Sequence, residues 1–237
     1  MGEREDAAPS EFPRQLLCRQ VCLHRRLAKV DEPVYNGRMA TSAKYTRAAR
    51  PVSLARERIL LTAHDLFYRD GIRSTGVDRV IERAGVTKVT FYRHFKSKND
   101  LIIAYLMYRH ERWMRWFTTA LQSHGGTLRA LVPTLAEWFR SPEYRGCAFI
   151  NGVSEIAPSL PEVAEITRRH KADMRSAITR LLPPGRRRAS LGQALALAVD
   201  GSIVQAQFCA DVNAVIRDLR RLVTAVAGED VKRTRAA

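Results

Sequence analysis

The sequence predicts an all-α protein of about nine helices. Apolar residues recur at three- and four-residue spacing from residue 53 onwards, and glycine and proline separate these segments. No segment shows a persuasive period-two alternation of the kind that marks a half-buried strand. The length of 237 residues and a hydrophobic share of 46% allow one large core or two modest ones.

The first fifty residues differ from the rest of the chain. They hold ten Lys and Arg and six Asp and Glu, and they lack a sustained apolar period. We expect residues 1–50 to form a disordered arm. Met39 is an alternative start, in which case residues 1–38 would not belong to the native protein. Cys18, Cys22 and His24 lack a second pair of metal ligands, so unpaired side chains are favoured over a metal site.

Three short helices are expected next. The first stops at Gly71, the second follows Thr75 as its N-terminal cap and ends at Gly85, and the third follows Thr87 as its cap through about Phe95. The residues with helical spacing in the first two are Ile59, Ala63, Leu66, Phe67, Val77, Val80, Ile81 and Ala84.

A long helix should open at Lys98, because Ser97 and Asp100 resemble a capping box, and run to about Thr119. Further helical segments are expected at residues 127–139, 147–156, 161–182, 190–209 and 212–227.

The third short helix has the chemistry of a DNA-reading helix. Between residues 87 and 98 there are cations but no acid, and hydrogen-bond donors are interleaved with them. Two helices joined across Gly85-Val86 fit a helix-turn-helix, and the net charge of +16 suits a polyanionic partner. The residues are Lys88, Arg93, Lys96 and Lys98, with Thr87, Thr90, Tyr92 and His94 between them; Phe91 and Phe95 should face the core.

The succession A-G-V-T-x-x-T-F-Y-x-H-F-x-S-K, from Ala84 to Lys98, resembles the TetR family of bacterial transcriptional regulators. The resemblance covers roughly residues 60–101 closely and the rest only in helix number and order. Val80-Ile81 and Val89 depart mildly from the usual pattern. The resemblance implies an N-terminal helix-turn-helix DNA-binding domain over residues 51–98, followed by a helical ligand-binding and dimerisation domain over residues 99–237.

The resemblance also implies roles for individual residues on double-stranded DNA. Thr87, Tyr92, His94 and Lys98 would hold phosphates, whereas Lys88, Val89, Thr90 and Arg93 would lie nearest the bases. Thr75 completes the expected DNA-binding set. Simpler interpretations are a solvated charge for Lys96, a capped surface histidine for His94 and a core position for Tyr92.

The second half is rich in aromatic residues. The resemblance implies a cavity for a small apolar or amphipathic effector, whose expected lining is Trp113, Trp116, Phe117, Trp138 and Phe149. The alternative for each aromatic residue is a place in an ordinary helical core. Cys147 is either a sensor of oxidants or electrophiles or, more commonly, a buried thiol.

The last two helices are expected to form an oligomer interface, and the resemblance implies a two-fold homodimer built from them. Residues 194–199 are apolar on all sides, and small residues at 194, 198 and 201 allow close approach. An apolar stripe follows in the final helix: Val212, Val215, Ile216, Leu219, Leu222, Val223 and Val226. Such a dimer would bind a palindromic operator and release it when the effector binds, which is repression, although activation stays open.

Several classes of protein are disfavoured. No apolar stretch approaches the ~18–20 residues of a membrane span, and no secretory signal is evident. Four scattered cysteines fit a cytoplasmic protein, and no cofactor is expected. The motifs G-x-S-x-G, H-E-x-x-H, the P-loop and C-x-x-C are missing from the sequence, so an enzyme is not expected. The alternative function is non-specific DNA binding without an effector.

Overall fold

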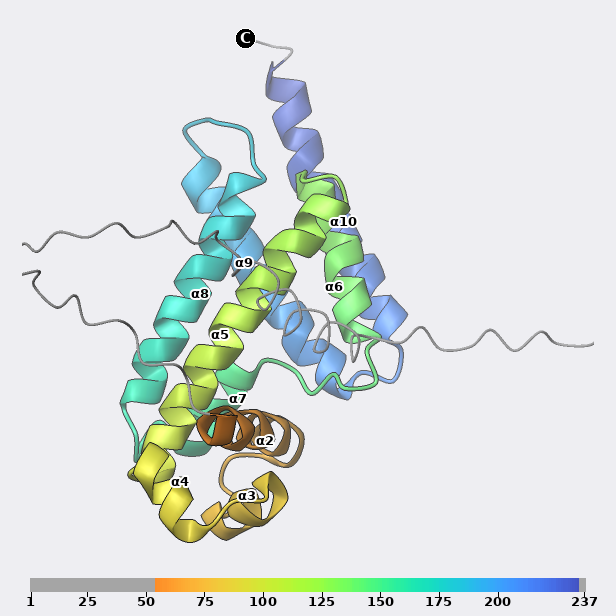
Figure 1. Ribbon diagram of the computed structural model, residues 1–237. Coiled ribbons are helices and arrows are strands. Elements are labelled where there is room, and N and C mark those ends of the chain that lie inside the picture. Colours follow the sequence, from red (N-terminus) through yellow and green to blue (C-terminus); the bar gives the residue numbers. More distant parts are fainter. Residues whose placement is uncertain (1–53, 235–237) are drawn as a thin grey trace, which may run out of the picture. The chain divides into compact units, whose positions relative to one another are not determined.

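The structure, a computed structural model, describes residues 54–234, with side chains to residue 227 (Figure 1). This part of the chain is helical throughout and contains no strand, which confirms the predicted fold class. The expectations for the N-terminal arm, including Met39 and the cysteines before it, lie outside the described residues. The elements are α2 (Leu54–Asp70), α3 (Val77–Ala84), α4 (Lys88–His94), α5 (Lys98–Ser123), the 3-10 turn η1 (Leu128–Ala130), α6 (Leu131–Phe139), α7 (Ala148–Ile156), α8 (Glu162–Arg180), α9 (Arg188–Phe208) and α10 (Val212–Thr234).

The turn between α3 and α4 follows from two residues. Gly85 ends α3 with a φ of 61°, a left-handed conformation that glycine adopts without the strain of a Cβ. Thr87 then caps α4, because its hydroxyl accepts the backbone N–H of Thr90 at 3.1 Å. Phe91 and Phe95 are buried, as predicted, so they attach α4 to the core and leave its other face to solvent.

The predicted cap of α3 is wrong. Its N-cap residue is Gly76, and no side chain caps that end. Thr75 has no exposed surface, and its hydroxyl donates to the carbonyl oxygen of Gly71 at 2.8 Å. The hydroxyl therefore stabilises the turn after α2 and does not cap the N-terminus of α3.

Helix α5 joins two parts of the core. Ser97 caps it by accepting the backbone N–H of Asp100 at 3.0 Å, as the capping box predicted. Its first turns bury Leu101 and Tyr105, and the Tyr105 ring contacts Phe67 of α2 edge to face at 5.4 Å. Its second half buries Trp113 and Phe117 against α6 and α8. The helix runs about one turn past its predicted end and stops before Gly125 and Gly126, both with positive φ.

The final two helices distribute their apolar faces differently from the prediction. On α10 most of the predicted interface stripe is buried within the same chain, where α10 packs against α6 and α9; the buried members are Val215, Ile216, Leu219 and Val223. Leu222 of that stripe is 51% exposed, and a longer row of exposed apolar residues lies on α9. We call it the α9 stripe: Ala194, Leu197, Gly201, Val204 and Phe208, which recur at three- and four-residue spacing and are all exposed.

Candidate nucleic-acid interface and effector cavity

The outer face of α4 gathers most of the predicted DNA-contacting residues. Val89 is 75% exposed and Tyr92 40% exposed, which excludes a core position for Tyr92. Lys88 and Arg93 are exposed beside them, and Thr90 is half-buried. A face with two cations, an apolar side chain and hydroxyl groups is suited to phosphates, base edges and thymine methyls.

Weak contacts hold this face together. Nη2 of Arg93 donates to the Thr90 hydroxyl at 3.2 Å, and that hydroxyl lies 3.0 Å from the Thr87 hydroxyl. Nζ of Lys88 lies 3.7 Å from Asp78 of α3, and both side chains are largely exposed. An exposed pair of this kind contributes little to stability, so DNA can replace it at small cost.

Lys98 and Thr75, two further predicted DNA-contacting residues, hydrogen bond to backbone oxygens of the turn after α2. The Nζ of Lys98 donates to the carbonyl oxygen of Arg73 at 3.4 Å, and burial lowers the pKa of this lysine. The side chain of Thr75 is inaccessible, so its assignment as a DNA contact is wrong for this structure. His94 is half-buried at the end of α4.

A carboxylate from α7 caps the turn between α2 and α3. One oxygen of Glu155 accepts the backbone N–H groups of Ile72 at 2.7 Å and Arg73 at 3.0 Å. The Arg73 guanidinium in turn donates to the backbone oxygen of Glu155 at 2.5 Å. Glu155 therefore ties the DNA-reading helices to the second half of the chain, a role that no sequence motif indicated.

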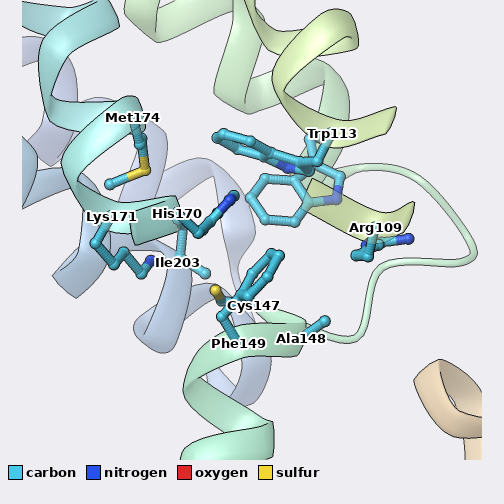
Figure 2. A pocket seen from close by; sticks show the side chains of 10 residues that line it. Arg109, Trp113, Cys147, Ala148, Phe149, His170, Lys171, Met174 and Ile203 are labelled. Carbon is cyan, nitrogen blue, oxygen red and sulfur yellow. The ribbon is translucent and has the colours of Figure 1, made fainter. Parts of the chain in front are cut away.

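Five helices enclose a cavity of about 10 Å³ (Figure 2). Of the expected lining, Trp113, Trp138 and Phe149 face this cavity, whereas Trp116 and Phe117 do not. The remaining lining residues are Arg109, Cys147, Ala148, His170, Lys171, Met174 and Ile203. A volume of 10 Å³ admits roughly one water molecule, so any larger molecule enters only if the walls move.

The aromatic side chains are also a tightly packed core. Trp113 stacks on Phe117 with ring centroids 4.6 Å apart, and Phe149 stacks on His170 at 3.7 Å. Trp116 contacts both Trp113 and Trp138 from the rim. Core packing and cavity lining are therefore roles of the same cluster. Cys147 is buried and free, which is the commoner of the two predicted roles for this thiol.

His170 makes stability depend on pH. Burial, with smaller effects from Lys171, His110 and Arg109, lowers its pKa from 6.5 to about 2, so it is neutral in the folded protein. The unfolded chain takes up the proton below pH 6.5 while the folded chain does not, and stability is lost as the pH falls through that range.

We expect the free energy of unfolding to fall by about 2 kcal/mol between pH 7 and pH 5 through this residue, since each unit is worth about 1.4 kcal/mol. Urea titrations across this range measure it. His170→Asn should flatten the decline. An unchanged slope in His170→Asn would contradict the assignment.

Arg109 links the cavity to α2. Its guanidinium lies over the Tyr68 ring, 3.9 Å from the centroid, and its Nη1 is 3.2 Å from Nε2 of His64. Arginine only donates, so Nε2 accepts and the proton of the neutral His64 sits on Nδ1, 3.0 Å from Asp65. Burial lowers the pKa of His64, which favours this neutral form. Tyr68 also donates its hydroxyl to the backbone oxygen of Gly146 at 3.0 Å.

Within residues 54–234 no cluster of three or more His, Cys, Asp or Glu is placed to hold a metal ion. None of the helices in this part of the chain combines the length and apolar character required to cross a membrane.

Comparison with known proteins supports the helix-turn-helix. The family model for bacterial regulatory proteins of the tetR family matches residues 59–105. The HTH-type transcriptional activator FasR of Mycolicibacterium smegmatis is 40% identical over 51 residues, but the match covers only 23% of that protein and 22% of this chain. A transcriptional regulator from Lactococcus lactis is 22% identical over 170 residues, 67% of this chain and 86% of that one.

Solved structures extend the similarity to most of the chain. A TetR-family transcriptional regulator from Streptomyces coelicolor is 35% identical, with a TM-score of 0.67, over 77% of this chain and 92% of that one. A TetR-family regulator from Cytophaga hutchinsonii shares the fold at 15% identity, with a TM-score of 0.64 over 74% of this chain and 98% of that one. The fold and these relatives are those of transcriptional regulators rather than enzymes. The chain therefore belongs to the TetR family of DNA-binding, helix-turn-helix transcriptional regulators.

Proposed function

We propose that the chain binds a palindromic operator as a homodimer and releases it when a small molecule enters the cavity between α5, α6, α7, α8 and α9. The observation that carries the DNA part is the exposed outer face of α4, anchored by the buried Phe91 and Phe95. Residues 51–98 supply the reading helices and residues 99–237 the regulatory part. Repression relieved by the effector is the sign of control we favour, although FasR is named an activator.

The α9 stripe supports the dimer. Leu197 is 71% exposed and Phe208 75% exposed. A row of large exposed apolar side chains usually marks a protein–protein interface. Their three- and four-residue spacing suits packing against a second helix, and Gly201 in the middle permits close approach. A second copy of the chain, related by a two-fold axis, would bring two α4 helices to the two halves of a palindrome.

Residues on α4 are proposed to divide the work of recognition. In this proposal Lys88 and Arg93 hydrogen bond to guanine, Val89 contacts a thymine methyl, and Tyr92 hydrogen bonds to a phosphate. Arg93→Ala should weaken operator binding by about 1–3 kcal/mol and relax the preference at one base pair, because a bidentate contact is lost. Tyr92→Phe should weaken binding to operator and shuffled DNA alike.

The test starts with selection of duplexes from a random pool by the purified chain at near-physiological salt. Fluorescence anisotropy then compares the selected and shuffled duplexes for each variant. Arg129→Ala, which removes an exposed charge from η1, is the matched control and should leave discrimination intact. Recovery of unselected DNA, or equal discrimination by Arg93→Ala and the unmodified chain, would favour non-specific binding by charge alone.

A further inference from the structure

We propose that the cavity takes an apolar molecule carrying one carboxylate or similarly compact anionic group, and that Arg109 binds this group. The proposal rests on the ligand-responsive function argued above. It assigns the chemical class of the effector, and it names Arg109 as the residue that transmits effector binding to α2.

The polar side chains around the cavity include two cations and no carboxylate. Arg109, Lys171 and the indoles of Trp113 and Trp138 line it together with the neutral His170 and the Cys147 thiol, and no Asp or Glu among the described residues does. Figure 2 shows Arg109 and Lys171 at opposite sides of the view, with aromatic rings between them. A donor-rich, acid-free lining with aromatic walls is complementary to an acceptor-bearing anion on an apolar body, and it repels an amine.

One donor in this lining has no partner. The Nε1 of Trp113 is buried and makes no hydrogen bond within the described part of the chain. Buried polar groups in proteins nearly always have a partner, and an exception often marks a place where a ligand or water supplies it. Because the indole N–H can only donate, the missing partner is an acceptor.

The two cations differ in how far they are neutralised. Nζ of Lys171 lies 2.6 Å from Asp200, and both side chains are mostly buried, so this charge already has a counter-ion. Arg109 has no carboxylate within ion-pair distance among the described residues. Its contacts are the Tyr68 ring and His64, which is neutral when it accepts the guanidinium. A carboxylate is a stronger partner for arginine than either of these contacts.

Those two contacts are what the anion would displace. Tyr68 and His64 both belong to α2, the first helix of the DNA-reading part. An arginine that turns toward a carboxylate in the cavity leaves the Tyr68 ring and the Nε2 of His64. The cavity volume of about 10 Å³ adds to this effect, because entry of any molecule larger than water displaces side chains of the wall, to which α5 contributes Arg109 and Trp113. Effector binding would thereby loosen α2 from α5.

The test measures binding directly, with the full chain and without DNA. Calorimetry and tryptophan fluorescence follow two matched sets of probes: 2-naphthoate, 2-naphthamide and 2-naphthylmethylamine, and decanoate, decanamide and decylamine. In at least one set the acid should bind about tenfold more tightly than the amide, and the amine should bind most weakly. Arg109→Gln should abolish the advantage of the acid, and Arg109→Lys should keep part of it. Arg115→Gln, which removes an exposed arginine from the same helix, should keep all of it.

Equal or tighter binding of an amide or amine, survival of the acid preference in Arg109→Gln, or no binding by any acid would overturn the assignment. Thermal melts establish that each variant is folded. Operator affinity is measured separately, so that the two proposals fail in different ways. An acid that binds through Arg109 without changing operator affinity contradicts the regulation and leaves the ligand class standing. If instead a neutral probe competes for the cavity and releases the operator, the regulation stands and the ligand class is contradicted.

Discussion

The double change Leu197→Asp and Phe208→Asp is expected to convert the chain to a monomer and to weaken operator binding about 10²–10⁴-fold. Both residues lie in the α9 stripe and are largely exposed, so the folded monomer tolerates aspartate there. In a dimer each aspartate would be buried without a partner, which is strongly unfavourable. The loss in DNA affinity follows because two linked reading helices gain avidity that a single one lacks.

Sedimentation or light scattering gives the oligomeric state, and anisotropy with the selected duplex gives the affinity. Met107→Asp is the matched control, since it places the same charge on an exposed apolar residue of α5 outside the α9 stripe. The control should remain dimeric. A dimeric double variant with undiminished affinity would show that the copies meet through another surface.

Glu155→Ala is expected to lower the free energy of unfolding by about 3 kcal/mol, because two hydrogen bonds to a charged group are worth roughly 1.5–3 kcal/mol each and are seldom additive. The two backbone N–H groups that donate to the Glu155 carboxylate lie in the turn between α2 and α3. Without the carboxylate the two N–H groups lose their acceptor on α7, although the Arg73 guanidinium still reaches the backbone oxygen of Glu155, so hydrogen exchange at Ile72 and Arg73 should accelerate. The measurement is chemical unfolding at a fixed protein concentration.

Glu155→Gln keeps an acceptor oxygen and should recover part of the stability. Glu143→Ala, at an exposed acidic position with no comparable role, should change the free energy of unfolding by less than about 0.5 kcal/mol. A Glu155→Ala protein as stable as the unmodified one would mean that water replaces the carboxylate at no cost.

Local signals account for what the sequence predicted well. Gly85, Thr87 and Ser97 act on backbone groups within three or four residues, and the structure has each helix boundary where these residues indicated. The prediction for Thr75 was wrong because a threonine before a helix can either accept an N–H of that helix or donate to a carbonyl oxygen of the preceding turn. The buried hydroxyl of Thr75 donates to the carbonyl oxygen of Gly71 in the preceding turn.

The remaining features depend on contacts between distant segments. Glu155 and Ile72 are separated by 83 residues, and Arg109 and His64 by 45, so no local pattern joins them. The final helix shows the same limit, because helical spacing identifies an apolar face without saying which surface covers it. Most of the stripe on α10 packs on its own chain, whereas the one on α9 stays exposed.

The continuity of α5 has a consequence for building hybrid regulators from this protein. A cut between residues 98 and 99 would separate Phe67 from Tyr105, which it contacts, and from Leu101 in the same buried cluster. An exchangeable recognition cassette must therefore extend at least through residue 105, where the family model also ends. The recipient must also offer a carboxylate in the place of Glu155, since the cassette alone leaves two backbone donors of its first turn without an acceptor. Grafts designed on helix boundaries alone should express poorly for this reason, whatever operator they were meant to read.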